Sequence, residues 1–148
     1  MTQSVVIDNS IVMRWFHPSG TQSDLAFADT ILEALEAGKI IPIAPIIFTM
    51  EFPNVLHNLR RRGELSRPVE TALLQWEHLG FEIIGTDHKA ILYMQALSQL
   101  CSEHGLSVYD AAYLELAIRL NCPLATLDKQ LEKATITADA ALFSSSAK

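Results

Sequence analysis

Cysteine and basic side chains are both scarce in this sequence. The chain of 148 residues has only two cysteines, Cys101 and Cys122, which lack the spacing of a metal site, so we expect reduced thiols in a cytoplasmic protein. The 11 Lys and Arg residues are outnumbered by 17 Asp and Glu residues, giving a net charge of −6. This balance excludes a protein that binds nucleic acid merely by neutralising phosphates, but it allows an enzyme that approaches phosphates through metal ions.

Long apolar runs are absent as well. No stretch approaches the ~20 residues of a membrane-spanning helix. The start of the chain lacks the basic residues and apolar core of a secretory signal, so we expect no contact with a membrane. Hydrophobic residues make up 49% of the chain and charged residues 19%, which is typical of a globular protein. The length is that of one domain, and we expect residues 1–148 to form a single domain.

Apolar runs of strand length alternate with amphipathic helical patterns along the chain. We expect strands at residues 4–7, 40–44, 81–84 and 123–127, with a weaker edge strand within residues 135–143. The spacing predicts helices at residues 11–16, 23–37, 46–63, 66–79, 106–120 and 129–134, one more from residue 86 or 87 to 104, and a loose Ser-rich tail. This alternation predicts an α/β fold in which helices cover both faces of a parallel sheet.

Residues 106–128 combine a helix, a turn, a strand and a closing carboxylate. Apolar residues recur there at steps of three and four and predict one buried helical face, formed by Leu106, Tyr109, Tyr113, Leu116, Ala117 and Leu120. Asn121 and Pro123 end this helix. Tyr109 has a second interpretation, because beside Asp110 it is also a candidate for stacking on a base. Trp15 and Trp76 lie on helical stripes and are predicted to belong to the core.

Four acidic residues are predicted to share one edge of the sheet. Asp8 and Asp128 directly follow apolar strands, and Glu51 and Asp110 lie near the N-terminal ends of helices. In open parallel sheets these positions meet outside the carboxyl ends of the strands. Two of the acids also have a simpler interpretation. Ser107-x-x-Asp110 fits a capping box, and Asp128 fits the N-cap of the helix that follows it.

Four clustered carboxylates repel one another unless a cation lies among them. An all-oxygen site of this kind suits Mg²⁺ or Mn²⁺, whereas zinc prefers His or Cys ligands. The five histidines show no ligand spacing, and no Ser–His or Cys–His pairing indicates covalent catalysis. The chemistry that follows is hydrolysis of a phosphodiester by metal-activated water.

Three segments make the sequence similar to a known family. VVIDNSIVMRW begins at Val5, EFPNVLHNL begins at Glu51, and LSVYDAAYLELAIRLNCPLATLD begins at Leu106 and is followed by KQLEKA. In this order and at these separations they resemble the PIN-domain ribonucleases, specifically the VapC-type toxins of type II toxin–antitoxin pairs. The resemblance covers nearly the whole chain. It implies a PIN-like three-layer α/β/α sandwich with a central parallel sheet of four to five strands. It also implies an Mg²⁺- or Mn²⁺-dependent endoribonuclease that cuts RNA, forms a homodimer and is neutralised by a VapB-type antitoxin inserted into the acidic cleft.

The resemblance also assigns residues to the site. The family's metal-site acids map to Asp8, Glu51, Asp110 and Asp128. Asp8 and Asp110 are expected to carry the essential metal ligation, and the other two acids to complete the site directly or through water. Four polar residues match positions beside the acids and are candidates for supporting them or contacting substrate: Asn9, Ser10, Asn54 and Thr126. Cap or turn chemistry accounts for these four equally well.

Other interpretations stay open at this point. A catalytically silent module could keep the same fold to bind a partner. A phospho-acceptor receiver or a phosphatase fits poorly, because Asp8-Asn9-Ser10 lacks the second acid that those sites use after the first strand. The triplet Arg60-Arg61-Arg62 is interpreted first as a solvated helix end and second as a contact for RNA or a partner. The identity of the RNA cannot be predicted from these motifs.

Overall fold

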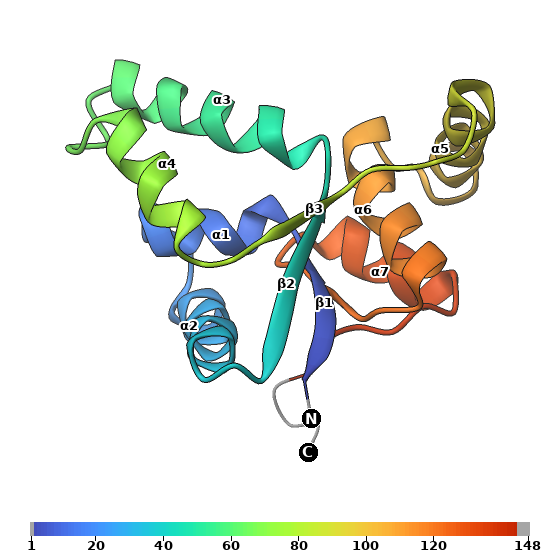
Figure 1. The fold of residues 1–148 in the computed structure, drawn as a ribbon, viewed down its shortest axis with the longest axis horizontal. Helices are drawn as coiled ribbons and strands as arrows, with labels where there is room; N and C mark the ends of the chain where they lie inside the picture. The colour runs from blue at the N-terminus through green and yellow to red at the C-terminus, as the bar shows by residue number, and fades with distance from the viewer. Residues whose placement is uncertain (1, 145–148) are drawn as a thin grey trace.

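The computed structural model describes residues 2–144, and its centre is a parallel sheet of four strands. The strands are β1 (Gln3–Ile7), β2 (Ile40–Pro45), β3 (Glu82–Ile84) and β4 (Leu124–Ala125). Their order across the sheet is β3-β2-β1-β4, and every pairing is parallel, with Val6 opposite Ile43 on one side and Leu124 on the other. In Figure 1 the strands β1 and β2 run upward, so their carboxyl ends are their upper ends. The predicted parallel α/β sheet is confirmed.

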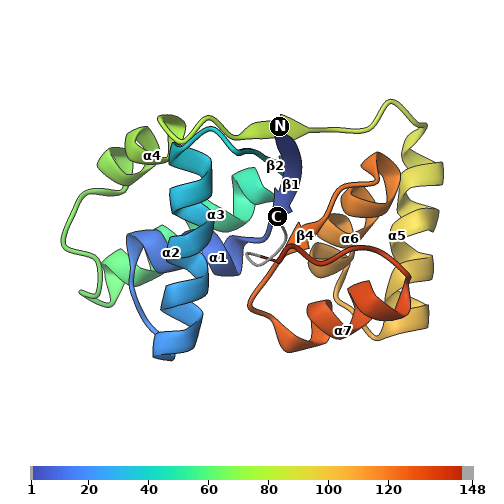
Figure 2. The ribbon, with the colours of Figure 1, turned by 90° about the horizontal axis from the view of Figure 1, so that it is seen from below.

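Within the described residues, seven helices cover the two faces of this sheet. They are α1 (Asn9–Phe16), α2 (Gln22–Glu36), α3 (Phe48–Arg61), α4 (Val69–Glu77), α5 (Ala90–His104), α6 (Val108–Leu120) and α7 (Lys129–Thr137). In Figure 2 the first four helices lie on one side of β1 and β2, and the last three lie on the other. The result is the three-layer sandwich that the sequence predicted. Within residues 2–144, none of the helices combines the length and apolarity that a membrane crossing requires.

The core forms where fully apolar segments are covered on both faces. Val5, Val6 and Ile7 of β1 have no exposed surface, as expected for a central parallel strand. A group of aromatic rings packs between α3, α4 and β3, where Phe48 stacks on Trp76 and Phe81 with centroid distances of 5.5 and 5.6 Å. Trp15 and Trp76 are partly buried against this core, in agreement with their predicted packing role.

Several predicted boundaries were wrong, for local reasons. Helix α4 begins at Val69 rather than at residue 66, because Pro68 precedes it in an extended conformation (φ −61°, ψ 147°). Helix α5 begins at Ala90 rather than near residue 86, because the Thr86 hydroxyl accepts the backbone N–H of His88 in a turn. Strand β4 spans two residues instead of five, because residues 126–128 bend into the candidate site.

The C-terminal part of the chain also differs from the prediction. Helix α7 continues to Thr137, so the residues expected to begin a weak edge strand are helical. An isolated parallel bridge between Leu124 and Leu142 is what remains of that strand. The loose tail was predicted for residues 144–148, and residues 145–148 lie outside the described part of the chain.

The predicted apolar face of α6 holds only in the middle of the helix. Tyr113, Leu116 and Ala117 are buried, but Tyr109 is 57% exposed at the N-terminal end and Leu120 is 40% exposed at the C-terminal end. Leu74 of α4 is also exposed, at 60%.

The three arginines at the end of α3 are engaged locally. Arg60 donates a 2.7 Å hydrogen bond to the carbonyl oxygen of Ser66, and Arg62 pairs with Glu64 at 2.7 Å. Arg61 donates a hydrogen bond to the Oδ1 atom of Asn58, one turn earlier in α3. These contacts tie the end of the helix to the following loop and favour the interpretation of the triplet as a solvated helix end.

Candidate active site

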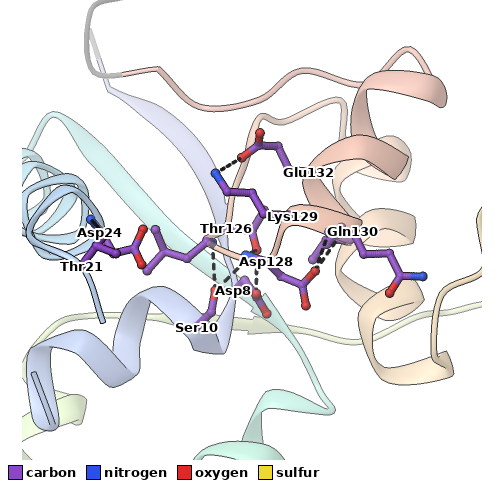
Figure 3. A network of polar contacts seen from close by, with 11 residues as sticks. Asp8, Ser10, Thr21, Asp24, Thr126, Asp128, Lys129, Gln130 and Glu132 are labelled. Atoms are coloured by element: carbon purple, nitrogen blue, oxygen red, sulfur yellow. Dashed lines mark hydrogen bonds and ion pairs between the residues drawn. The ribbon is translucent and has the colours of Figure 1, made fainter. Parts of the chain in front are cut away.

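Asp8 is the most deeply buried acid at the carboxyl edge of the sheet. Its backbone N–H donates to the carbonyl oxygen of Ala125 at 3.0 Å, which extends the pairing of β1 with β4 by one residue. Its side chain is 5% exposed. The Oδ2 atom accepts the hydroxyl protons of Ser10 at 2.7 Å and Thr126 at 2.8 Å. Figure 3 shows these three side chains meeting where β1 and β4 end.

The two hydroxyl groups also join the strand ends to each other. The Ser10 hydroxyl accepts the backbone N–H of Leu127 at 3.0 Å, and the Thr126 hydroxyl accepts that of Asp128 at 3.0 Å. Each hydroxyl therefore donates its single proton to Asp8 and accepts one N–H from the backbone. Because Oδ2 is held by both hydroxyls, the carboxylate of Asp8 has a fixed orientation.

Glu51 lies in the first turn of α3 and is held by a residue that sequence reasoning assigned to the core. The Tyr113 hydroxyl donates a 2.6 Å hydrogen bond to Oε1 of Glu51. Tyr113 is fully buried on α6, and burial and the nearby carboxylates raise its pKa, so its phenol stays protonated as the donor. The sequence contained one indication of this role, because Tyr113 follows Asp110 by three residues and the two side chains therefore lie on one side of α6. That spacing was interpreted as apolar packing alone.

Asp128 caps a helix, as its simpler interpretation predicted, and the Ser107 half of the capping box predicted at Asp110 is present. The Ser107 hydroxyl accepts the backbone N–H of Asp110 at 3.1 Å at the start of α6. Oδ1 of Asp128 accepts the N–H groups of Gln130 and Leu131 at 2.9 and 3.0 Å at the start of α7. Both bonds end at Oδ1, so the cap does not use Oδ2 of Asp128.

The four acids form one electrostatic group. Burial raises the pKa of Asp8 from its usual 3.8 to about 6; the bonds from Ser10 and Thr126 oppose this rise, and the charges of Asp110 and Glu51 add to it. Burial raises the pKa of Glu51, against the bond from Tyr113, and the charge of Asp110 raises it further. The pKa of Asp110 is raised first by burial and then by the charge of Asp128. Each acid is thus coupled to at least one other through like-charge repulsion.

The remaining predicted residues divide into two groups. Ser10 and Thr126 contact Asp8, as described above. The Oδ1 atom of Asn9 is buried directly after Asp8 and has no hydrogen-bond partner among residues 2–144. Asn54 is exposed on α3, and no hydrogen bond joins it to an acid within the described residues. The structure therefore joins Ser10 and Thr126 to Asp8 directly, whereas Asn9 and Asn54 form no hydrogen bond to an acid within residues 2–144 and their roles stay predictions.

The chemistry of the donor set fits a hard divalent cation. All four acids offer oxygen, their mutual repulsion would be relieved by positive charge, and the unpaired carbonyl of Asn9 is a further oxygen donor. As placed, however, no three His, Cys, Asp or Glu side chains in residues 2–144 are arranged to hold a metal ion. Three of the acids are instead turned to partners of their own: Asp8 to two hydroxyls, Glu51 to Tyr113, and Asp128 to the start of α7.

Comparisons with known proteins agree with this fold. A family model described as "PIN domain" matches residues 5–136. The solved structure of PAE2754 from Pyrobaculum aerophilum is 20% identical, with a TM-score of 0.62 over 90% of this chain and 87% of that one. The structure of FitAcB from Neisseria gonorrhoeae is 19% identical, with a TM-score of 0.57 over 97% of this chain and 99% of that one. Likenesses at this level of identity show the fold alone. No curated protein matches the sequence.

Proposed function

The chain belongs to the PIN-domain family, and we propose that it is a metal-dependent endoribonuclease, a VapC-type toxin whose activity a cognate antitoxin blocks. Proteins of this family are usually metal-dependent nucleases. The observation that carries the proposal is the buried carboxylate of Asp8, which is oriented by Ser10 and Thr126 and coupled by charge to two other acids, Asp110 and Glu51. We further propose that residues 1–148 act as one domain in the cytoplasm.

The proposed metal ligands are Asp8 and Asp110, with Glu51 and Asp128 completing the site directly or through water. A divalent cation, Mg²⁺ or Mn²⁺, would polarise the phosphodiester and make a water molecule more acidic. The chain's own contribution is orientation. Ser10 and Thr126 hold Asp8 through Oδ2, and Tyr113 holds Glu51 through Oε1. Burial of Asp8 strengthens its interaction with any cation, because the surroundings screen charge less than water does.

The acids also set the conditions for binding RNA. Four carboxylates repel a phosphate, and the whole chain carries a net charge of −6. A phosphodiester therefore approaches this edge of the sheet only when cations offset that charge. We expect RNA binding at the site, and not only cleavage, to depend on divalent ions.

The proposal is tested by incubating purified, antitoxin-free protein with total bacterial RNA in Mg²⁺, in Mn²⁺ and in EDTA. We expect discrete fragments with either ion, none in EDTA, and none with Asp8→Asn. Asp29→Asn, the same change at an exposed position on α2, is the matched control and should cleave normally. No cleavage under any condition by folded protein that binds the metal would overturn the proposal.

A second candidate function is a binding module without catalysis. The observation that favours it is that no three metal-ligating side chains in the described residues are arranged to hold an ion. Calorimetric titration with Mn²⁺ separates the two. A nuclease site binds the ion and loses it with Asp110→Asn, whereas a silent module shows no site-specific binding and cleaves no RNA.

Two partners belong to the proposal, a second copy of the chain and the antitoxin. On α5, the side chains of Ile91, Leu92 and Met94 are each more than half exposed, which supports a homodimer through this helix. Exposed apolar residues also directly precede two of the acids, since Met50 precedes Glu51 and Tyr109 precedes Asp110. Apolar residues beside an acidic site suit a VapB-type segment that carries both apolar and basic side chains.

A further inference from the structure

A cavity of about 390 Å³ opens beside the candidate active site and is not used by the proposed chemistry. Its walls come from the first turns of α2 and α7, from the end of β4 and from the segment 142–144. This volume lies in the range of small-molecule sites, which span about 300–1,000 Å³. Any ligand there would contact four separate parts of the chain.

One residue connects the cavity to the active site. Thr126 lines the cavity, and its hydroxyl donates to Oδ2 of Asp8 at 2.8 Å. A group bound in the cavity therefore lies one side chain away from the proposed metal ligand. In Figure 3, Asp24 of α2 lies on the opposite side of Thr126 from Asp128. For a substrate held at Asp8, the cavity is a neighbouring subsite.

The polar groups of the cavity favour an uncharged ligand with hydrogen-bond donors. The carboxylate of Asp24 lines it and forms no hydrogen bond or ion pair within residues 2–144. Glu132 also lines it, and the Nζ atom of Lys129 is 3.8 Å from Oε2 of Glu132, a loose contact for a lysine whose side chain is 84% exposed. With two carboxylates and one lysine, the cavity lining carries more negative than positive charge. It therefore repels a phosphate group but accepts hydrogen bonds from the N–H or O–H groups of a ligand.

The apolar groups of the cavity favour a planar ligand. Phe27 of α2 and Phe143 of the C-terminal segment both line it and are both partly buried. Aromatic side chains are the common surface on which single-stranded nucleic acids stack their bases. The cavity thus combines aromatic walls, hydrogen-bond acceptors and a nearby phosphodiester site.

We propose that this cavity binds one base of the RNA, guanine, next to the phosphate that is cut. The proposal rests on the proposed nuclease function. Guanine has two adjacent donors on its pairing edge, N1–H and the N2 amino group, and one carboxylate accepts both. Adenine, cytosine and uracil lack that adjacent pair of donors. The unpaired carboxylate of Asp24 is the group that reads the base, and Lys129 at the rim contacts the adjoining phosphate.

The test uses neutral nucleosides, so that neither metal nor catalysis is required. Guanosine, adenosine, cytidine and uridine are titrated separately into the ¹⁵N-labelled, full-length protein in EDTA while the backbone amide signals are followed. We expect guanosine alone to shift the signals of residues around Asp24 and Thr126 in a saturable way, at least tenfold more tightly than the other three. Asp24→Asn should remove that preference, whereas Asp29→Asn, on the same helix, should keep it.

Lys129→Gln provides an independent variant on the exposed rim. It should leave guanosine binding within twofold of the original and weaken a guanosine-containing dinucleotide severalfold, because only the dinucleotide carries the adjoining phosphate. Cleavage sites mapped on total RNA should have guanine at one fixed position beside the cut, and Asp24→Asn should relax that preference without abolishing cleavage.

The outcomes separate this inference from the nuclease proposal. Metal-dependent cleavage with no guanine preference and no nucleoside shifts at the cavity would overturn the inference and leave the nuclease intact. Guanosine binding without any RNA cleavage would support the cavity and count against the nuclease. Equal shifts with all four nucleosides would refute the assignment of guanine. If none of the four nucleosides shifts the amide signals of the cavity but the antitoxin does, the cavity is a binding site for that partner instead.

Discussion

The phenol of Tyr113 on α6 donates a 2.6 Å hydrogen bond to Oε1 of Glu51 on α3, across 62 residues of sequence. Tyr113 is fully buried and Glu51 is half-buried, so this bond joins the core to the candidate site. The same hydrogen bond lowers the pKa of Glu51 and so opposes the rise that burial causes. Removing it should affect both the stability of the fold and the ionisation of the acid.

Tyr113→Phe tests this relationship. The ring stays in the core, but the carboxylate loses its donor, and a hydrogen bond to a charged group contributes about 1.5–3 kcal/mol. Because Glu51 is only half-buried, we expect a loss near the lower end of that range. RNA cleavage should fall about tenfold as Glu51 loses its orientation. Urea unfolding and cleavage rates measure the two effects.

The matched control for that change is Tyr109→Phe. Tyr109 lies one turn earlier on α6 and is exposed, so loss of its hydroxyl should alter the free energy of unfolding by less than about 0.5 kcal/mol. Equal effects of the two substitutions on stability and cleavage would show that the bond to Glu51 has no special role.

Asp8 should make the metal-free protein less stable as pH rises. Its folded-state pKa is raised from 3.8 to about 6, so the folded protein holds this proton more tightly than the unfolded chain does. The stabilising contribution is complete below about pH 4 and is lost as pH rises through 6. A shift of this size corresponds to about 3 kcal/mol. Glu51 and Asp110, whose pKa values are also raised, act in the same direction.

The measurement is urea unfolding in EDTA at pH 4.5 and at pH 7. Asp8→Asn has no ionisable group at this position, so it should show a smaller loss of stability between the two pH values than the original protein. Asp29→Asn should behave like the original protein. A pH dependence unchanged by Asp8→Asn would contradict the raised pKa.

Divalent ions should reverse this instability near neutral pH. An ion that binds only the folded protein at 100 times its dissociation constant stabilises it by about 2.7 kcal/mol. We expect Mn²⁺ to raise the free energy of unfolding by about that amount at pH 7, and Asp110→Asn to remove most of the gain while Asp29→Asn keeps it. Stabilisation that survives loss of Asp110 would place the ion elsewhere on the surface.

The sequence was sufficient for the sheet and for the neighbourhood of Asp8. The strand β1 was recognisable because a parallel strand covered on both faces must be apolar throughout, and Val5, Val6 and Ile7 are. The acid that directly follows such a strand lies at the ligand-binding edge by topology alone. The contact between Thr126 and Asp8 follows from the same rule, since β4 pairs beside β1.

The parts that the sequence did not predict depend on contacts between distant elements. A periodic stripe places Tyr113 and Tyr109 on the same face of α6, but only the packing of α3 and the exposed start of the helix decide that one is buried and the other exposed. The cavity between α2 and α7 has no local signature at all, because its walls come from four separate segments. In the sequence, Asp24 has the features of an ordinary acid in the first turn of a helix, so nothing there indicates that it lines a cavity.

Asp128 allows the two interpretations of an acid at a helix start to be separated by experiment. Its Oδ1 atom caps α7 through the N–H groups of Gln130 and Leu131, and its charge is one of the causes of the raised pKa of Asp110. Asn caps a helix about as well as Asp does, whereas replacement by Ala costs about 1 kcal/mol. Asp128→Asn therefore removes the charge and keeps the cap, and Asp128→Ala removes both.

If Asp128 serves the site, both variants should lose most of their RNA cleavage, although only Asp128→Ala should unfold at lower urea concentration. The pKa of Asp110 should fall in both, because a like charge has gone, and ¹³C-detected titration of the Asp110 carboxyl measures that change. If Asp128 serves only as a helix cap, Asp128→Asn should cleave RNA at the original rate. Asp128→Ala should then lose cleavage only under conditions in which part of the protein is unfolded. The comparison is decisive because the two variants differ in the cap and share the loss of charge.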